Sequence, residues 1–180
     1  MKTHIALLRG INVGGRGKLP MKQLASLLQQ LGCENVATYI QSGNAVFRCA
    51  AADAKGLAGR LQAAIEKWAG FAPRVLILEA KALEKAVAAN PYPMVDAEPT
   101  SLHLFFLADK PKKPDFDAML RVKIASEQFA LQGKVFYLFA PEGFGTSKLA
   151  AGAEKWLGVD ATARNWRTVC ALAEMAKSRD

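Results

Sequence analysis

The hydrophobic residues of the first 80 positions form short apolar runs that alternate with leucine-rich amphipathic stretches. Apolar runs of four to eight residues are typical of buried strands, and apolar positions three or four apart are typical of helices. A Ser-Gly-Asn turn signal separates two of the runs. The predicted order is strand, helix, two strands, helix and strand, over residues 4–10, 20–32, 34–50, 53–70 and 73–80.

The second half of the chain predicts the same order after a short helix at 80–90 and a proline-rich loop at 91–99. Gly133 marks a compact turn between the two middle strands. A last helix is predicted at 165–178. The repeated strands and helices are predicted at residues 101–108, 113–122, 126–141, 145–158 and 159–164.

The repeated order predicts an α+β protein with two tandem ferredoxin-like subdomains. Each is a split β-α-β unit, or α/β plait, with a mainly antiparallel sheet and helices on one face. The repetition lies in the order of elements and not in residue identity. We expect a first plait, a helix with a Pro-rich connector, a second plait and a C-terminal helix, over residues 1–80, 81–100, 101–163 and 164–180.

The composition favours a globular protein, because 51% of the 180 residues are hydrophobic. No apolar run approaches the roughly 18 residues of a membrane span, and Arg9 ends the first apolar stretch before it reaches signal-peptide length. We therefore expect a cytoplasmic protein without membrane contact. Three widely spaced cysteines and two histidines inside apolar runs indicate no disulfide framework and no metal site, and no cofactor is predicted.

The net charge of +8 is unevenly distributed. Residues 1–80 hold ten Lys and Arg against four Asp and Glu, whereas residues 81–180 hold fourteen against twelve. No acidic residue precedes Glu34. The excess of positive charge predicts attraction of nucleic acid or an anionic small molecule. The alternative is that the charge only keeps the protein soluble.

A glycine-rich, basic stretch follows the first predicted strand at residues 9–20. It is no P-loop, because Asn12 and Leu19 occupy the positions of the first glycine and the hydroxyl residue, and Asn12 also breaks the dinucleotide-binding pattern. Its glycines permit a nest of main-chain amides for an anion; the alternative is a flexible connection with solvated cations. The candidate residues are Arg9, Asn12, Gly14, Gly15, Arg16 and Lys18.

A second loop with two glycines, at residues 143–148, precedes a predicted helix and is interpreted as the counterpart of the first. A hydroxyl cap, free amides and a lysine in the first turn suit a phosphate or carboxylate, with Ser147 and Lys148 as candidates. The simpler alternative is that Thr146 or Ser147 only caps the helix.

Two further groups combine aromatic and polar side chains. Around the first hairpin, a base could stack and form hydrogen bonds, or the aromatic ring could pack within the sheet. Before the last helix, a tryptophan between arginines could bind an anionic aromatic ligand, or it could be buried beneath them. The candidates are Tyr39, Gln41 and Asn44 in the first group and Arg164, Asn165 and Trp166 in the second.

Several of these stretches resemble a bacterial family known as a conserved domain of unknown function. They are LLRGINVGG, TYIQSGNAVF, ANPYP, YLFAPEGFGTSKL and ATARNWRTV, and the resemblance covers about residues 4 to 175. It implies a pair of α/β plaits but no activity and no catalytic residues. Ala163 departs from the family pattern, which has a threonine there, so a ligand contact by that hydroxyl does not carry over.

Three functions fit these patterns. The first is binding of an anionic ligand or nucleic acid through the basic glycine-rich loops. The second is an enzyme or sensor for a small phosphorylated or carboxylated metabolite held between the two plaits. The third is a structural or interaction protein, such as a homo-oligomer. The sequence identifies no catalytic residue and leaves open whether the protein is an enzyme.

Overall fold

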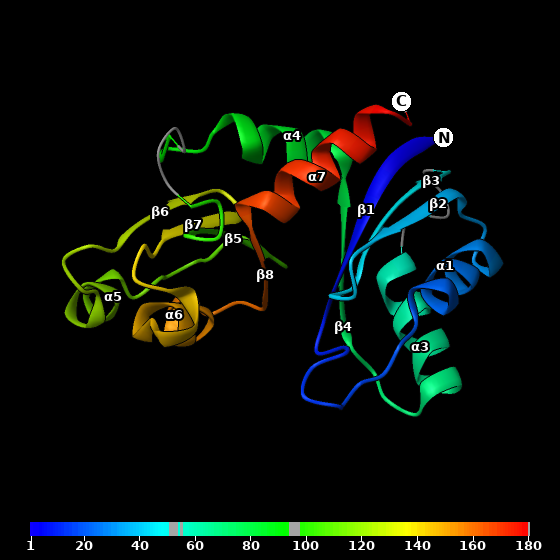
Figure 1. Cartoon of the computed structure of the whole chain (residues 1–180), viewed down its shortest axis with the longest axis horizontal. Coiled ribbons are helices and arrows are strands. Elements are labelled where there is room, and N and C mark those ends of the chain that lie inside the picture. The colour runs from blue at the N-terminus through cyan, green and yellow to red at the C-terminus, as the bar shows by residue number, and fades with distance from the viewer. Residues whose placement is uncertain (51–53, 55, 94–97, 180) are drawn as a thin grey trace. The chain divides into compact units, whose positions relative to one another are not determined.

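A computed structural model describes residues 1–50, 54, 56–93 and 98–179 (Figure 1). Its contacts divide the chain into two compact units. Unit 1 comprises Met1–Lys85 and Ala171–Asp180, and unit 2 comprises Ala86–Cys170. No helix among the described residues is both long enough and apolar enough to cross a bilayer.

Unit 1 contains a four-stranded sheet of order β2-β3-β1-β4, in which all neighbouring strands are antiparallel. Helices α1 and α3 cover one face of this sheet (Figure 1). The elements are β1 (Lys2–Arg9), α1 (Met21–Gln30), β2 (Glu34–Tyr39), β3 (Asn44–Cys49), α3 (Leu57–Ala69) and β4 (Arg74–Glu79), followed directly by α4 (Ala80–Ala88).

Unit 2 repeats this topology with the sheet order β6-β7-β5-β8. Its elements are β5 (Leu102–Leu107), α5 (Phe116–Val122), β6 (Gln128–Gln132), β7 (Val135–Phe139), a 3₁₀ turn (Phe144–Thr146), α6 (Lys148–Leu157) and β8 (Ala161–Asn165), followed directly by α7 (Trp166–Lys177). The prediction of two tandem α/β units is confirmed, and each unit's last strand runs straight into a helix.

The helix-covered face of each sheet forms a hydrophobic core. In unit 1, Ala6 and Leu8 of β1 pack with leucines of α1 and α3. In unit 2, Phe105 and Leu107 of β5 pack with Met119 and with α6. These residues alternate along each central strand, as the pleat requires.

The opposite face of each central strand is buried as well. Ile5 and Leu7 of β1 are fully buried, and so is Leu104 of β5. On β7, the Tyr137 hydroxyl donates a hydrogen bond to the Ala86 carbonyl at 2.7 Å, and burial raises the pKa of Tyr137. Burial on both faces explains why β1 and β5 read as continuous apolar runs.

The β2–β3 turn packs tightly against the end of β1. The Leu8 amide donates to the Gly43 carbonyl at 2.8 Å. Gly43 has φ +83°, and a Cβ atom there would lie 2.7 Å from both Leu8 Cβ and Ile11 Cδ1. Only glycine fits this position without displacing core side chains.

Gly43→Ala is expected to lower the free energy of unfolding by about 2–4 kcal/mol, since it adds overpacking to an unfavourable φ. Gly133→Ala is the matched control: Gly133 has φ +59° with no atom near the added Cβ, so the cost is about 1 kcal/mol. Urea unfolding followed by circular dichroism measures both, and equal losses would contradict the packing argument.

Candidate functional site

Three connections of unit 1 meet where β1 ends. Strands β1 and β2 run in the same direction and β4 starts here, so the β1–α1, β2–β3 and α3–β4 connections share one end of the sheet. We call residues 9–20, 40–43 and 70–74 the basic loop end. It contains no acidic residue and four exposed cations: Arg9, Arg16, Lys18 and Arg74.

The glycine-rich stretch folds into a small hairpin within this end. The Val13 amide donates to the Arg16 carbonyl at 3.2 Å, and the Arg16 amide donates to the Val13 carbonyl at 2.9 Å. Gly14 and Gly15 both have positive φ, as a two-residue primed turn requires. A third main-chain bond joins the Asn12 amide to the Gly17 carbonyl at 2.9 Å. Much of the main-chain donor capacity proposed for an anion is therefore used inside the hairpin.

The Asn12 side chain fixes the hairpin to the rest of the basic loop end. Its Oδ1 accepts from the Leu19 amide at 2.9 Å, while its Nδ2 donates to the Leu19 carbonyl at 3.0 Å and to the Gln41 carbonyl at 2.8 Å. Asn12 has φ +52°, a region that asparagine tolerates. The role of Asn12 is to join two loops, with its amide group already engaged.

Two apolar side chains protrude beside the cations. Val13 at the hairpin is 68% exposed, and Ile40 in the neighbouring turn is 51% exposed. Ile40 also has φ +47°, which is unfavourable for a β-branched residue and is found where the surroundings hold the backbone in place. The surface of this end is therefore basic and partly apolar.

Arg9 and Arg74 stand directly opposite each other in the β1–β4 register. Residues in register point to the same face of a sheet, and like charges placed there repel each other.

The loop at residues 143–148 lies at the opposite end of its own unit. It follows β7, which is antiparallel to β5, so it lies where β5 starts, and the Ala140 amide donates to the Ser101 carbonyl at 2.7 Å. The interpretation of this loop as the counterpart of the glycine-rich stretch is therefore wrong in topology. Ser147 caps α6 by accepting from the Ala150 amide at 3.0 Å, and Lys148 is exposed in the first turn.

The true counterpart of the glycine-rich stretch is the β5–α5 connection at residues 108–115. It is rich in lysine too, but acidic side chains accompany the lysines. Lys134 from the facing turn lies 3.4 Å from the Asp109 carboxylate, and Asp160 follows α6 at the same end. The two units thus differ in charge balance at equivalent positions.

The second predicted group meets the 143–148 loop at the start of β5. His103 stands opposite Asn165 in the β5–β8 register, and its ring stacks on Phe144 with centroids 3.7 Å apart. Asn165 caps α7 by accepting from the Thr168 amide at 2.9 Å. Arg164 donates to the Ala163 carbonyl at 2.8 Å, and burial lowers the pKa of Arg164 to about 10.

Sequence reasoning missed the central position of His103, because an isolated histidine in an apolar run gives no signal of its partners. Its Nδ1 is buried and has no hydrogen-bond partner among the described residues. Burial lowers the pKa of His103 to about 4, so the ring is neutral near pH 7. Trp166, the first residue of α7, is partly buried.

The candidates of the first hairpin divide between surface and interior. Gln41 is exposed, whereas Asn44 is fully buried and donates to the Tyr39 carbonyl at 3.0 Å and the Ser42 hydroxyl at 2.9 Å. Asn44 therefore stabilises the turn and is closed to a ligand. Tyr39 is partly buried opposite Asn44.

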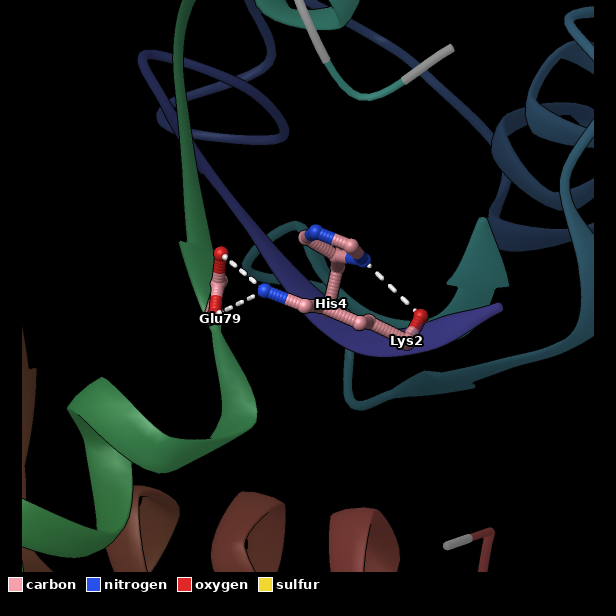
Figure 2. Close-up of polar contacts among 3 residues, drawn as sticks. All are labelled: Lys2, His4 and Glu79. Atoms are coloured by element: carbon pink, nitrogen blue, oxygen red, sulfur yellow. Dashed lines mark hydrogen bonds and ion pairs between the residues drawn. The ribbon is translucent and has the colours of Figure 1, made fainter. Parts of the chain in front are cut away.

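The far end of β1 carries a separate polar cluster. Lys2 bonds both carboxylate oxygens of Glu79 at 3.2 Å, and the His4 Nδ1 lies 2.9 Å from the Lys2 carbonyl (Figure 2). A carbonyl only accepts, so the His4 Nδ1 carries the proton. His4 is buried against Phe47, and its polar contact is met within the strand.

A family model described as "Protein of unknown function (DUF1697)" matches residues 1–137. The chain belongs to the DUF1697 family. Among solved structures, it is similar to the conserved bacterial protein SP0830 from Streptococcus pneumoniae, with 22% sequence identity and a TM-score of 0.70. That match covers 97% of this chain and 98% of the other, and it supports the fold. A search of curated proteins finds no match.

In this DUF1697 chain, Asn12→Gly removes three side-chain hydrogen bonds while keeping the backbone geometry acceptable. We expect a loss of about 2–3 kcal/mol in unfolding free energy and faster exchange of the Leu19 amide. Asn35→Gly is the control, since Asn35 has the same φ of +52° and an exposed side chain. Urea unfolding and hydrogen exchange measure the effect; equal stability of the two variants would refute it.

The neutral His103 predicts a pH dependence of stability for this DUF1697 chain. Its pKa in the folded state, about 4, lies below the ordinary 6.5, so the unfolded state takes up the proton first as pH falls. The contribution of the neutral His103 to the free energy of unfolding is complete above pH 6.5, and it declines by about 1–2 kcal/mol towards pH 4. His103→Phe keeps an aromatic ring against Phe144 but should flatten this part of the profile. Urea midpoints at pH 7 and 4.5 test it, and identical profiles would contradict the assignment.

Proposed function

We propose that the basic loop end of unit 1 binds nucleic acid through its phosphate backbone. The observation that carries this proposal is the gathering of four exposed cations on three connections that contain no acidic residue. Basic surfaces attract polyanions and gain affinity from released counterions. The equivalent end of unit 2, where Lys134 pairs with Asp109, lacks this imbalance.

The shape of the surface favours an extended partner over an enclosed small molecule. The hairpin projects, with Val13 at 68% exposure and Gly14, Gly15 and Arg16 all exposed. Cations on exposed loops can contact successive phosphates of a strand, whereas a small ligand is bound by a concave pocket. Exposed Val13 and Ile40 add apolar surface that suits sugars and base edges.

Recognition by an open sheet face, as RNA-recognition plaits use, is not supported in this chain. Ile5 and Leu7 are fully buried on the face of β1 opposite the core with α1 and α3. On β7, Tyr137 is buried and bonded to the Ala86 carbonyl. Stacking platforms on these faces are closed, so contacts through the loops are the proposed mode.

Fluorescence anisotropy with labelled single-stranded and duplex oligonucleotides tests the proposal. The salt concentration is varied from about 25 to 200 mM, because salt screens the attraction between cations and phosphates. With up to four phosphate contacts, the logarithm of the association constant should fall with the logarithm of salt with a slope of about −3. The triple variant Arg16→Gln, Lys18→Gln and Arg74→Gln should bind at least tenfold more weakly, with a slope smaller in magnitude by about 2.

The matched control removes equal charge elsewhere, through Lys81→Gln, Lys85→Gln and Lys155→Gln, all exposed positions on helices. It should bind within about twofold of the unmodified chain, apart from the uniform effect of net charge. Equal weakening of both triple variants would refute the assigned surface. Absence of oligonucleotide binding at the lowest salt would refute the function itself.

A further inference from the structure

Helix α5 of unit 2 leaves large apolar side chains uncovered. Phe116 is 40% exposed and Leu120 is 58% exposed; four residues apart on a helix, they share one face. Ile124, just beyond the end of the helix, is 44% exposed. We call Phe116, Leu120 and Ile124 the α5 patch. Exposed apolar residues that cluster are typical of interaction surfaces, whereas scattered ones are ordinary.

The α5 patch is held in place from beneath. Ala118 and Met119 are buried on the inner side of the helix, and Met119 belongs to the core of unit 2. The Asp115 carboxylate caps the helix by accepting from the Ala118 amide at 2.9 Å, while the Asp115 amide donates to the Trp156 carbonyl at 2.8 Å. The helix therefore presents its outer face in a fixed orientation.

The two ends of the patch are fixed as well. The Phe116 ring stacks on Phe129 with centroids 6.2 Å apart. The Ile124 amide donates to the carboxylate of Glu127 at 3.1 Å, and Glu127 is itself buried. A surface whose side chains are ordered before binding loses little entropy when a partner arrives.

An open hollow of about 600 Å³ adjoins Phe116 and is lined by Lys113, Pro114, Asp115, Phe116 and Asp117. A second open hollow, of about 890 Å³, lies beside it along the lysine-rich connection from Asp109 to Lys113 and reaches Leu157–Val159. Hollows next to exposed apolar residues accept side chains of a partner.

Four cations lie close to the α5 patch along the chain. Lys112 and Lys113 precede the helix, Arg121 is exposed in its last turn, and Lys123 follows it. The acidic residues nearby, Asp115 and Asp117, lie at the start of the helix, where carboxylates stabilise the helix dipole. The segment from Lys112 to Ile124 therefore has more cations than carboxylates beside its exposed apolar residues.

We propose that the α5 patch docks an acidic amphipathic segment of a partner protein. Its apolar residues would cover Phe116 and Leu120 and enter the adjoining hollow, and its carboxylates would face the lysines and Arg121. A second copy of this chain is disfavoured by the net charge of +8.

Fluorescence anisotropy with the full chain tests this proposal. The probe is a labelled 16-residue peptide with Leu and Phe on one helical face and Glu and Asp on the other; the reference peptide has the same composition in scrambled order. We expect saturable binding of the amphipathic peptide and at least tenfold weaker binding of the scrambled one. Leu120→Ser should weaken binding at least fivefold, because Leu120 contributes most exposed apolar surface of the patch.

Trp68→Ser is the matched control, since it removes an exposed apolar side chain from helix α3 of unit 1, and it should leave peptide binding unchanged. Circular dichroism of Leu120→Ser checks that the fold is kept. Equal affinity for both peptides, or unchanged binding by Leu120→Ser, would overturn the proposal. Dimerisation or binding to anionic vesicles that Leu120→Ser abolishes would overturn it in favour of those occupants. Oligonucleotide binding by Leu120→Ser reports separately on the basic loop end.

Discussion

Burial of both faces of the central strand is the constraint on which each unit depends. Thr3 to Leu8 of β1 are all buried, and β5 is buried at all but one position. A strand enclosed on both sides offers no side chain to solvent along its length. The central strands therefore leave exposed polar side chains to other parts of each unit, such as the connections at the ends of the sheets and the outer faces of helices. The two surfaces singled out here, the basic loop end and the α5 patch, lie at such places.

The same topology has produced different chemistry at equivalent positions of the two units. The connection after β1 is short of acids and closes on itself through Asn12, whereas the connection after β5 contains Asp109, which pairs with Lys134. The cores below are alike in plan, with apolar residues alternating along the central strand. Because core packing depends on the strands and helices, the connections are free to diverge without cost to the fold.

The element order was accessible from the sequence because it depends on local spacing. The leucines of α1, the turn glycines Gly43 and Gly133, and the cap Ser147 act within a few residues of their own position. Each of these predictions was confirmed by the structure.

Contacts between distant segments could not be predicted in the same way. Nothing near Asn12 in sequence shows that its amide reaches the Gln41 carbonyl, 29 positions away. Likewise, the stacking of His103 on Phe144 and the burial of Asn44 follow from strand pairing. The mistaken equivalence of the two glycine loops had the same origin, because strand direction decides which end a loop occupies. The ligand-binding role of the candidate residues stays a prediction.

The ladder between Val13 and Arg16 gives the hairpin a property that a loose glycine loop would lack. Glycine is the residue with most backbone freedom to lose, and residues 10–17 contain four of them. Because the hairpin closes with two main-chain bonds of its own, that freedom is already gone in the folded chain. The main chain at Arg16 is thus already ordered before any partner approaches, so binding would not have to order it.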